Sequence, residues 1–126
     1  MKKLKAIFLI IFLCSTAFGA SVEERRTKVI SIIDQELKEI TRLNKQTGSR
    51  NPNLLLRMAE LLLEKARHVK EQENAVYLGL DSLQRSNVNK SKYFKKSQKY
   101  FVQAQKTCYY ILKRFKKFKQ KGDVYY

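Results

Sequence analysis

The sequence predicts an all-α protein made of antiparallel helical hairpins, within a single domain of 126 residues. Three long segments repeat apolar residues at the helical period. Only 4 Gly and 1 Pro occur, which is too few for a turn-rich β architecture. Hydrophobic residues make up 44% of the chain and charged residues 30%, so the chain can fold although its net charge is +16.

Residues 1–19 have the layout of a secretory signal peptide. The first five residues carry three lysines, and an apolar run follows them. Ala17 and Gly19 then occupy the third and first positions before a cut between Gly19 and Ala20. A cut one residue later would leave the bulky Phe18 three positions upstream, so the first cut is favoured.

Two other interpretations of this segment stay open. The apolar run 6–13 would serve as an uncleaved membrane anchor, but it is well short of the ~20 residues that span a bilayer. Lipidation at Cys14 is the minor alternative, because Leu13 is not the small residue that bacterial lipoproteins place before that cysteine. Cleavage would produce an exported protein, periplasmic or secreted, with no spanning segment. Its single cysteine, Cys108, could form no internal disulfide.

The first helix is expected over residues 22–47. Ser21 and Glu24 have the spacing of a capping box, in which the serine serves a free helix amide and the glutamate reaches back. Gly48 is expected as the C-terminal cap. The apolar residues that recur through the segment are Val29, Ile30, Ile32, Ile33, Leu37, Ile40 and Leu43.

A second helix is expected from Asn51-Pro52 to about residue 84, with Asn51 as cap and Pro52 where its missing N–H costs nothing. Gly79 weakens its last turns. These two helices make up an N-terminal region over residues 20–87, and the polar stretch 86–91 predicts a loop. The apolar face of the second helix consists of Leu55, Met58, Leu62, Ala66, Val69, Val76 and Leu80.

The third helix, expected over residues 92–117, separates apolar from basic residues most completely. At ~100° per residue, its apolar stripe covers about a third of the circle. That stripe contains Tyr93, Phe94, Ser97, Tyr100, Phe101, Ala104, Cys108, Ile111, Leu112, Phe115 and Phe118. The opposite face carries Lys95, Lys96, Lys99, Lys106, Lys113, Arg114 and Lys117.

After this helix, Gly122 and Asp123 indicate a loop that ends in a helix cap. We therefore expect residues 88–126 to form the basic helix plus the start of a further helix. A helix start with nothing behind it is unfavourable, because nucleation then lacks propagation. Two interpretations remain: the chain is a fragment of a longer protein, or its last residues are a frayed tail.

The stretch 104–115 resembles the second helix of a tetratricopeptide repeat. In that family a small residue, an aromatic four positions on, and an apolar pair before a terminal aromatic pack one helix against the next. Cys108 here replaces the usual aromatic, and Lys116 stands where the family often has Pro. The resemblance implies a fragment of an α-solenoid in which the packing residues are Ala104, Cys108, Ile111, Leu112 and Phe115.

Two other stretches look like parts of such a repeat array. Residues 123–126 are similar to the opening of the next repeat's first helix, and residues 51–66 are similar to the helical lead-in of exported bacterial repeat proteins. No full unit of roughly 34 residues with its Trp, Gly and Pro landmarks is present. The alternative is an ordinary amphipathic helical hairpin, whose core has the same small and aromatic residues.

The basic charge is concentrated in the last third of the chain. Residues 88–126 hold 12 Lys and Arg against one acid, Asp123, whereas residues 20–87 hold 12 against 10. This asymmetry predicts an anionic partner, such as a membrane or another envelope surface, unless the lysines merely form a solvated helix face. Nucleic acid is disfavoured because the protein is predicted to be exported and because the aromatic residues lie on the apolar stripe.

No arrangement of residues predicts an enzyme, a metal site or a cofactor. His68 lies beside the apolar stripe of the second helix, among cations, and is expected at the surface. Cys108 faces the stripe of the third helix and is expected to be a small buried hydrophobe. Surface ion pairs with neighbouring Lys and Arg are expected for Glu60, Glu64, Glu71 and Glu73.

The sequence therefore predicts a non-enzymatic, exported helical-repeat scaffold that mediates protein–protein interactions in the cell envelope. The alternative is a small cationic protein that binds an anionic membrane or envelope surface through the helix at 92–117. The two predictions differ in how binding depends on salt. Salt screens the charge of the lysines and would weaken binding to an anionic surface, whereas contacts through an apolar groove would persist.

Overall fold

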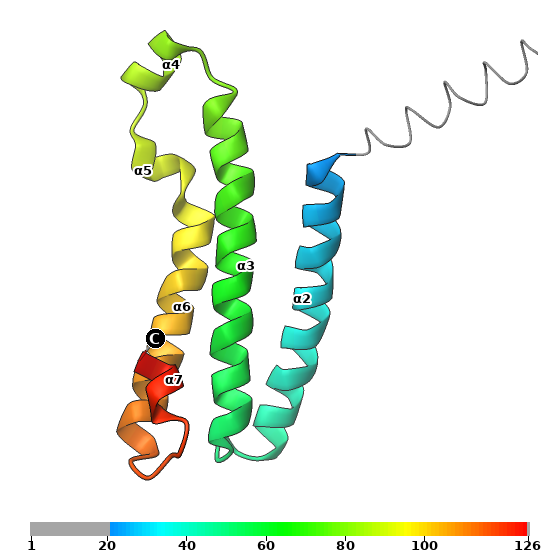
Figure 1. Ribbon diagram of the computed structural model, residues 1–126, viewed down its shortest axis with the longest axis vertical. Helices are drawn as coiled ribbons and strands as arrows, with labels where there is room; N and C mark the ends of the chain where they lie inside the picture. The colour runs from blue at the N-terminus through cyan, green and yellow to red at the C-terminus, as the bar shows by residue number, and fades with distance from the viewer. Residues whose placement is uncertain (1–20, 126) are drawn as a thin grey trace, which may run out of the picture.

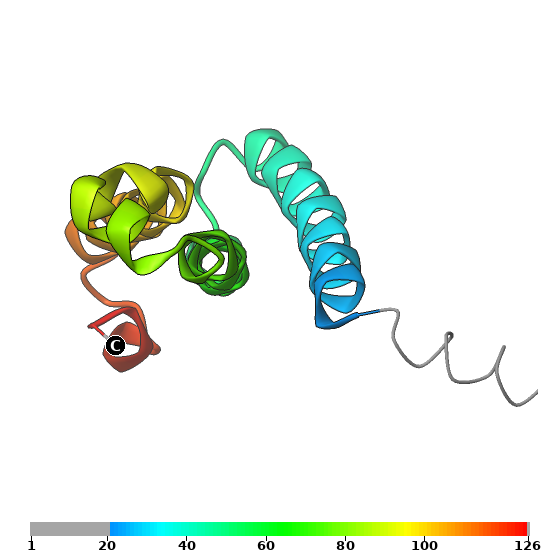
Figure 2. The ribbon, with the colours of Figure 1, turned by 90° about the horizontal axis from the view of Figure 1, so that it is seen from above.

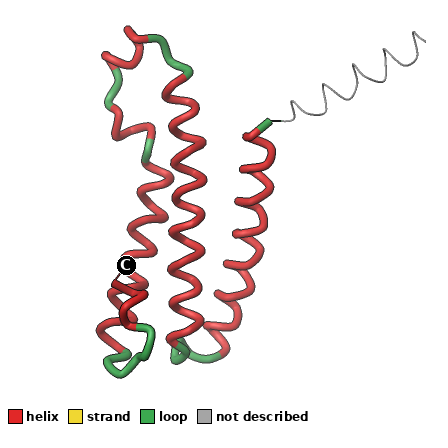
Figure 3. Tube along the Cα trace, viewed as in Figure 1, coloured by secondary structure: helices red, strands yellow, loops and turns green. Residues whose placement is uncertain are grey.

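The computed structural model describes residues 21–125, and every regular element in this range is helical, which confirms the all-α prediction. The long helices run side by side in alternating directions, with α3 in the middle (Figure 1) and loops at the ends (Figure 3). The signal peptide predicted for residues 1–19 lies outside the described residues. In chain order the helices are α2 Val22–Gln46, α3 Pro52–Leu78, α4 Ser82–Asn87, α5 Lys90–Tyr93, α6 Lys95–Arg114 and α7 Lys121–Tyr125.

Helix α2 has nearly the predicted bounds but not the predicted N-terminal cap. Ser21 is the cap residue, yet its side chain makes no capping hydrogen bond, so the capping box with Glu24 is not formed. At the other end Gly48 follows the cap residue Thr47 with φ 62°, and its N–H donates to the Lys45 carbonyl at 3.2 Å. Glycine fits this position because the left-handed conformation carries little steric cost without a Cβ.

Helix α3 begins as predicted and ends earlier than predicted. The Asn51 side chain accepts a hydrogen bond from the Asn53 amide at 3.0 Å, and Pro52 occupies the first turn. The helix ends at Leu78, because the chain starts a new helix, α4, with its own capping box between Asp81 and Gln84. The loop predicted over residues 86–91 is shorter in the structure: only Val88 and Asn89 lie between helices, since α4 ends at Asn87 and α5 begins at Lys90.

The predicted third helix is divided at Phe94, where φ is −108° and ψ is 19°. In an unbroken helix the amides of Lys96 and Ser97 would donate to carbonyls one turn earlier. Here they donate to the Glu73 carboxylate of α3, at 2.9 Å and 3.3 Å to Oε1. The Ser97 hydroxyl also donates to Glu73, at 2.5 Å. Glu73 therefore caps α6 from another helix and stabilises its positive N-terminal end.

The end of the basic helix also differs from the prediction. α6 ends at Arg114 rather than near residue 117, and the chain turns back at Phe115. Phe115 and Phe118 still pack against the core after this turn. The further helix predicted from residue 124 begins at Lys121, so it includes Gly122 instead of following it.

Two buried clusters form the core. Ile33 and Ile40 of α2 pack with Leu61 of α3, and a second cluster joins α3, α6 and α7. The members of the second cluster are Leu55, Leu56, Ile111 and Val124. Two residues assigned to apolar faces from the sequence are instead exposed, because no helix within residues 21–125 covers their side of α2 or α3: Ile32 and Val76, each 62% exposed.

Ion pairs add to the contact between α2 and α3. Lys65, in the middle of α3, also places its Nζ 4.3 Å from the ring centre of Tyr100 on α6, so this one side chain links three helices. Burial alone would lower the pKa of Lys65, but its interactions with Asp34 and Tyr100 outweigh burial and raise that pKa. The pairs are Arg26–Glu71 at 3.1 Å, Arg57–Glu36 at 2.8 Å and Lys65–Asp34.

Candidate interaction surfaces

Four of the five residues expected to pack in a repeat lie on the inner face of α6, and the fifth, Phe115, directly follows this helix. Ala104 and Ile111 have no exposed surface. The other expected packing residues are half-buried and contact the cluster formed by α3, α6 and α7: Cys108, Leu112 and Phe115. α7 lies against the α3–α6 pair and away from α2 (Figure 2).

A groove of about 400 Å³ opens between α3, α6 and α7. Its lining is mostly apolar, and one wall is the exposed ring of Tyr125. Burial raises the pKa of the Cys108 thiol, which keeps the thiol neutral and makes it an apolar part of the wall rather than a nucleophile. The lining residues are Leu63, Phe101, Val102, Ala104, Gln105, Cys108, Val124 and Tyr125.

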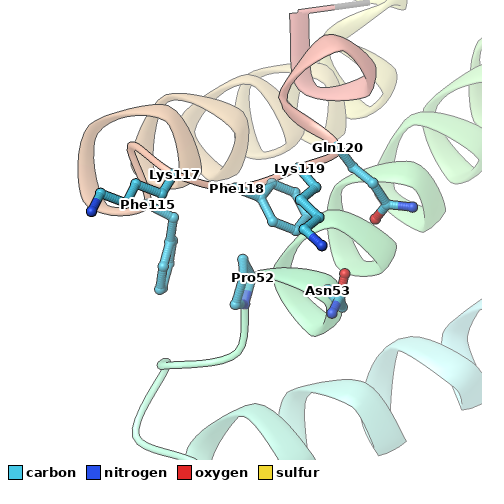
Figure 4. A pocket seen from close by; sticks show the side chains of 7 residues that line it. All are labelled: Pro52, Asn53, Phe115, Lys117, Phe118, Lys119 and Gln120. Carbon is cyan, nitrogen blue, oxygen red and sulfur yellow. The ribbon is translucent and has the colours of Figure 1, made fainter.

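A second cleft, of about 580 Å³, lies at the start of α3 (Figure 4). The rings of Phe115 and Phe118 flank Pro52 there. Lys117, which was expected on the basic helix, lines this cleft beyond the end of α6. The remaining lining residues are Asn53, Lys119 and Gln120.

The predicted basic face is exposed throughout. Its residues, Lys95, Lys96, Lys99, Lys106, Lys113, Arg114 and Lys117, form no ion pair with any described residue. Four of them form what we call the lysine row, because at ~100° per residue they fall within about 40° of one another along α6. The row consists of Lys95, Lys99, Lys106 and Lys113.

Sequence reasoning missed the apolar residues beside the lysine row. Val102, Tyr109 and Tyr110 are 39%, 64% and 42% exposed, although long apolar side chains usually face the core. On the same helical wheel they lie within about 60° of Lys95, so they share the outer face with the row, although Val102 also reaches the groove. Their positions on the helical wheel follow from the sequence, but their exposure does not, because it depends on which sides of α6 the other helices cover.

The titratable residues singled out from the sequence lie apart in the structure. No group of three or more His, Cys, Asp or Glu side chains within residues 21–125 could hold a metal ion. His68 is half-buried on α3. Of the expected surface ion pairs, Glu60 pairs with Arg57 and Glu71 with Arg26, whereas Glu73 caps α6 instead.

The same range contains no helix whose length and apolar character would carry it across a bilayer. No protein family, curated protein or solved structure matches this chain.

Proposed function

We propose that this protein is a helical-repeat scaffold that binds a protein partner in the groove between α3, α6 and α7. One observation carries the proposal. Val124 of the short helix α7 is 5% exposed and belongs to the same buried cluster as Leu55 of α3 and Ile111 of α6. In repeat arrays each helical pair packs in this way against the first helix of the next unit.

The contacts of α6 support a likeness to a tetratricopeptide repeat. α3 and α6 would form one helical pair, and α7 would be the first helix of the next unit. Ala104 is fully buried, as the small residue of such a pair would be, because it lets two helix backbones approach closely. Two features depart from the pattern: Cys108 in place of an aromatic residue, and the short helices α4 and α5 between the paired helices.

The groove has the chemistry of a binding site for an apolar side chain. Its walls combine aliphatic and aromatic surface with one amide, that of Gln105. The exposed ring of Tyr125, at 72%, offers the type of residue that dominates binding energy in protein interfaces. We infer a partner that inserts an apolar or aromatic residue between α6 and α7. Since burial of apolar surface drives such binding, it would tolerate salt.

We also propose that the protein is exported, to the periplasm or beyond the cell. The support is the sequence pattern of residues 1–19, which favours cleavage between Gly19 and Ala20. A scaffold without enzymatic chemistry would then act on partners in the cell envelope.

Site-specific photocrosslinking in intact cells tests this function. A photoreactive phenylalanine derivative would replace Tyr125 in one variant and Leu83 of α4 in the control, since both side chains are about equally exposed, at 72% and 73%. We expect a discrete adduct from position 125 alone, which persists at high salt and is recovered from the envelope, with the mass of the scaffold starting at Ala20. Equal adducts from both positions, or none, would contradict a binding groove.

A further inference from the structure

We propose that the outer face of α6 adsorbs to an anionic phospholipid surface. This inference goes beyond the scaffold function and is independent of it, because the lysine row points away from the inner face of α6. The same helix would then hold a protein partner on one side and a membrane on the other.

The arrangement of charge supports adsorption. From Lys95 to Lys113 the lysine row extends over 18 residue steps, or about 27 Å of helix at 1.5 Å per residue. Each of its four side chains is exposed and lacks an ion pair with the described residues, whereas Arg26, Arg57 and Lys65 are paired with acids. The ammonium groups of the row are therefore available, in one line, to an external anionic surface.

The residues beside the row support a lipid surface in particular. Tyr109 and Tyr110 stand between Lys106 and Lys113, and Val102 stands between Lys99 and Lys106. Tyrosine is enriched at membrane–water interfaces, where the ring lies at the level of the headgroups and the hydroxyl remains hydrated. The spacing 95, 99, 102, 106, 109, 113 alternates steps of four and three residues, which keeps cations and apolar groups on one side of the helix.

The type of cation argues against nucleic acid. Residues 88–126 contain eleven lysines and one arginine. Arginine is the residue that makes bidentate, geometrically fixed contacts with phosphate, whereas lysine acts as a hydrated point charge. A row of lysines thus suits long-range attraction to laterally mobile headgroups better than it suits recognition of a fixed phosphate pattern.

The shape of the face argues against an acidic protein. A stable protein interface buries about 800 Å² on each side around a complementary apolar centre. Of the three exposed apolar residues beside the row, Val102 also lines the groove with α7, so only Tyr109 and Tyr110 remain to form an apolar centre on this convex helix. A fluid lipid surface needs no such complementarity.

Vesicle sedimentation tests the proposal on the full chain. We expect binding to phosphatidylcholine vesicles that contain phosphatidylglycerol, and a steep loss of binding when salt rises from about 0.05 M to about 0.5 M. Each lysine near an anionic surface changes the partition coefficient about fivefold, so K99Q with K106Q should lower it about 25-fold. Binding to neutral vesicles measures any contribution from the apolar run 6–13, because the partition of apolar residues into a bilayer does not require anionic lipid.

Two matched variants locate the effect. The pair K28Q and K38Q makes the same charge change on exposed positions of α2, and it should lower the partition coefficient by less than about threefold. Tyr109→Ala should weaken binding while leaving its salt dependence unchanged, because it removes a ring and no charge. Circular dichroism would check that each variant keeps the helical content of the wild type.

Several results would overturn the proposal. Equal losses for the α2 and α6 lysine pairs would mean that net charge, rather than this face, attracts the vesicles. Binding to polyglutamate or duplex DNA without binding to anionic vesicles would assign the face to an acidic protein or to nucleic acid. None of these outcomes depends on the groove, and crosslinking at Tyr125 would remain interpretable after each of them.

Discussion

Glu73 shows how a single side chain determines where a helix begins. Its carboxylate accepts hydrogen bonds from the amides of Lys96 and Ser97 and from the Ser97 hydroxyl, so the start of α6 is held by α3. Ser97 is buried at 2% exposed, and besides Glu73 its hydroxyl can donate to the Phe94 carbonyl at 3.1 Å. Hydrogen bonds to a charged group contribute more to stability than hydrogen bonds between neutral groups.

We predict that Glu73→Ala lowers the free energy of unfolding by about 1–3 kcal/mol, because it removes the charged acceptor of the partly buried Ser97 amide and hydroxyl. Chemical denaturation measures this change. Glu64→Ala is the matched control, since Glu64 is an exposed residue of the same helix and should change stability by less than about 0.5 kcal/mol. Similar values for both variants would show that the Glu73 cap does not hold α6.

Residue burial could be predicted wherever a neighbouring helix covers the predicted stripe. Ala104 and Ile111 were placed in the core from spacing alone, and both have no exposed surface. Spacing could not identify Ile32 and Val76 as exposed, because it does not say how wide a face the neighbour covers. The role of Glu73 could not be predicted either, since it depends on a contact across 23 residues of sequence.

At the scale of elements, α2 is a long helix whose main neighbour is α3. It packs on α3 through Ile33, Ile40 and Leu61 and three interhelical ion pairs. Exposed ion pairs contribute little, with about 0–1 kcal/mol for each. The apolar cluster should therefore dominate the attachment of α2.

We predict that Ile33→Ala destabilises the protein by about 2–4 kcal/mol, because Ile33 is 4% exposed and its loss opens a cavity. The adjacent Ile32→Ala makes the same chemical change at a position that is 62% exposed, and it should cost less than about 1 kcal/mol. Thermal or urea unfolding compares the two. Equal costs would mean that α2 is rotated relative to α3 or detached from it.

Element boundaries could be predicted where local capping decides them. The start of α3 follows from Asn51-Pro52, and the end of α2 is close to Gly48. The start of α4 could also have been predicted, because Asp81 and Gln84 have capping-box spacing, but residues up to about 84 were assigned to the second helix and residues 86–91 to a loop. The break at Phe94 could not be predicted. The apolar stripe continues across it, and the carboxylate that caps α6 belongs to Glu73 of another helix, α3.

For the whole molecule, the division of α6 into two faces connects the fold to both proposals. The inner face packs against α3 and α7 and borders the groove, while the outer face carries the lysine row and Tyr109. The charge asymmetry was visible in the sequence, and so was the packing stripe. The groove was not, because it depends on where α7 folds back after the chain turns at Phe115.

The position of α7 decides whether the chain forms a repeat-like stack, and a double-mutant cycle between Val124 and Leu55 tests it most directly. We predict that Val124→Ala costs about 1–3 kcal/mol, and that Leu55→Ala and Val124→Ala couple by at least about 0.5 kcal/mol, because both side chains belong to one buried cluster. Tyr125→Ala, at a residue 72% exposed, should leave stability nearly unchanged. Additive effects, with no cost from Val124→Ala alone, would mean that α7 is a frayed tail and would contradict the scaffold.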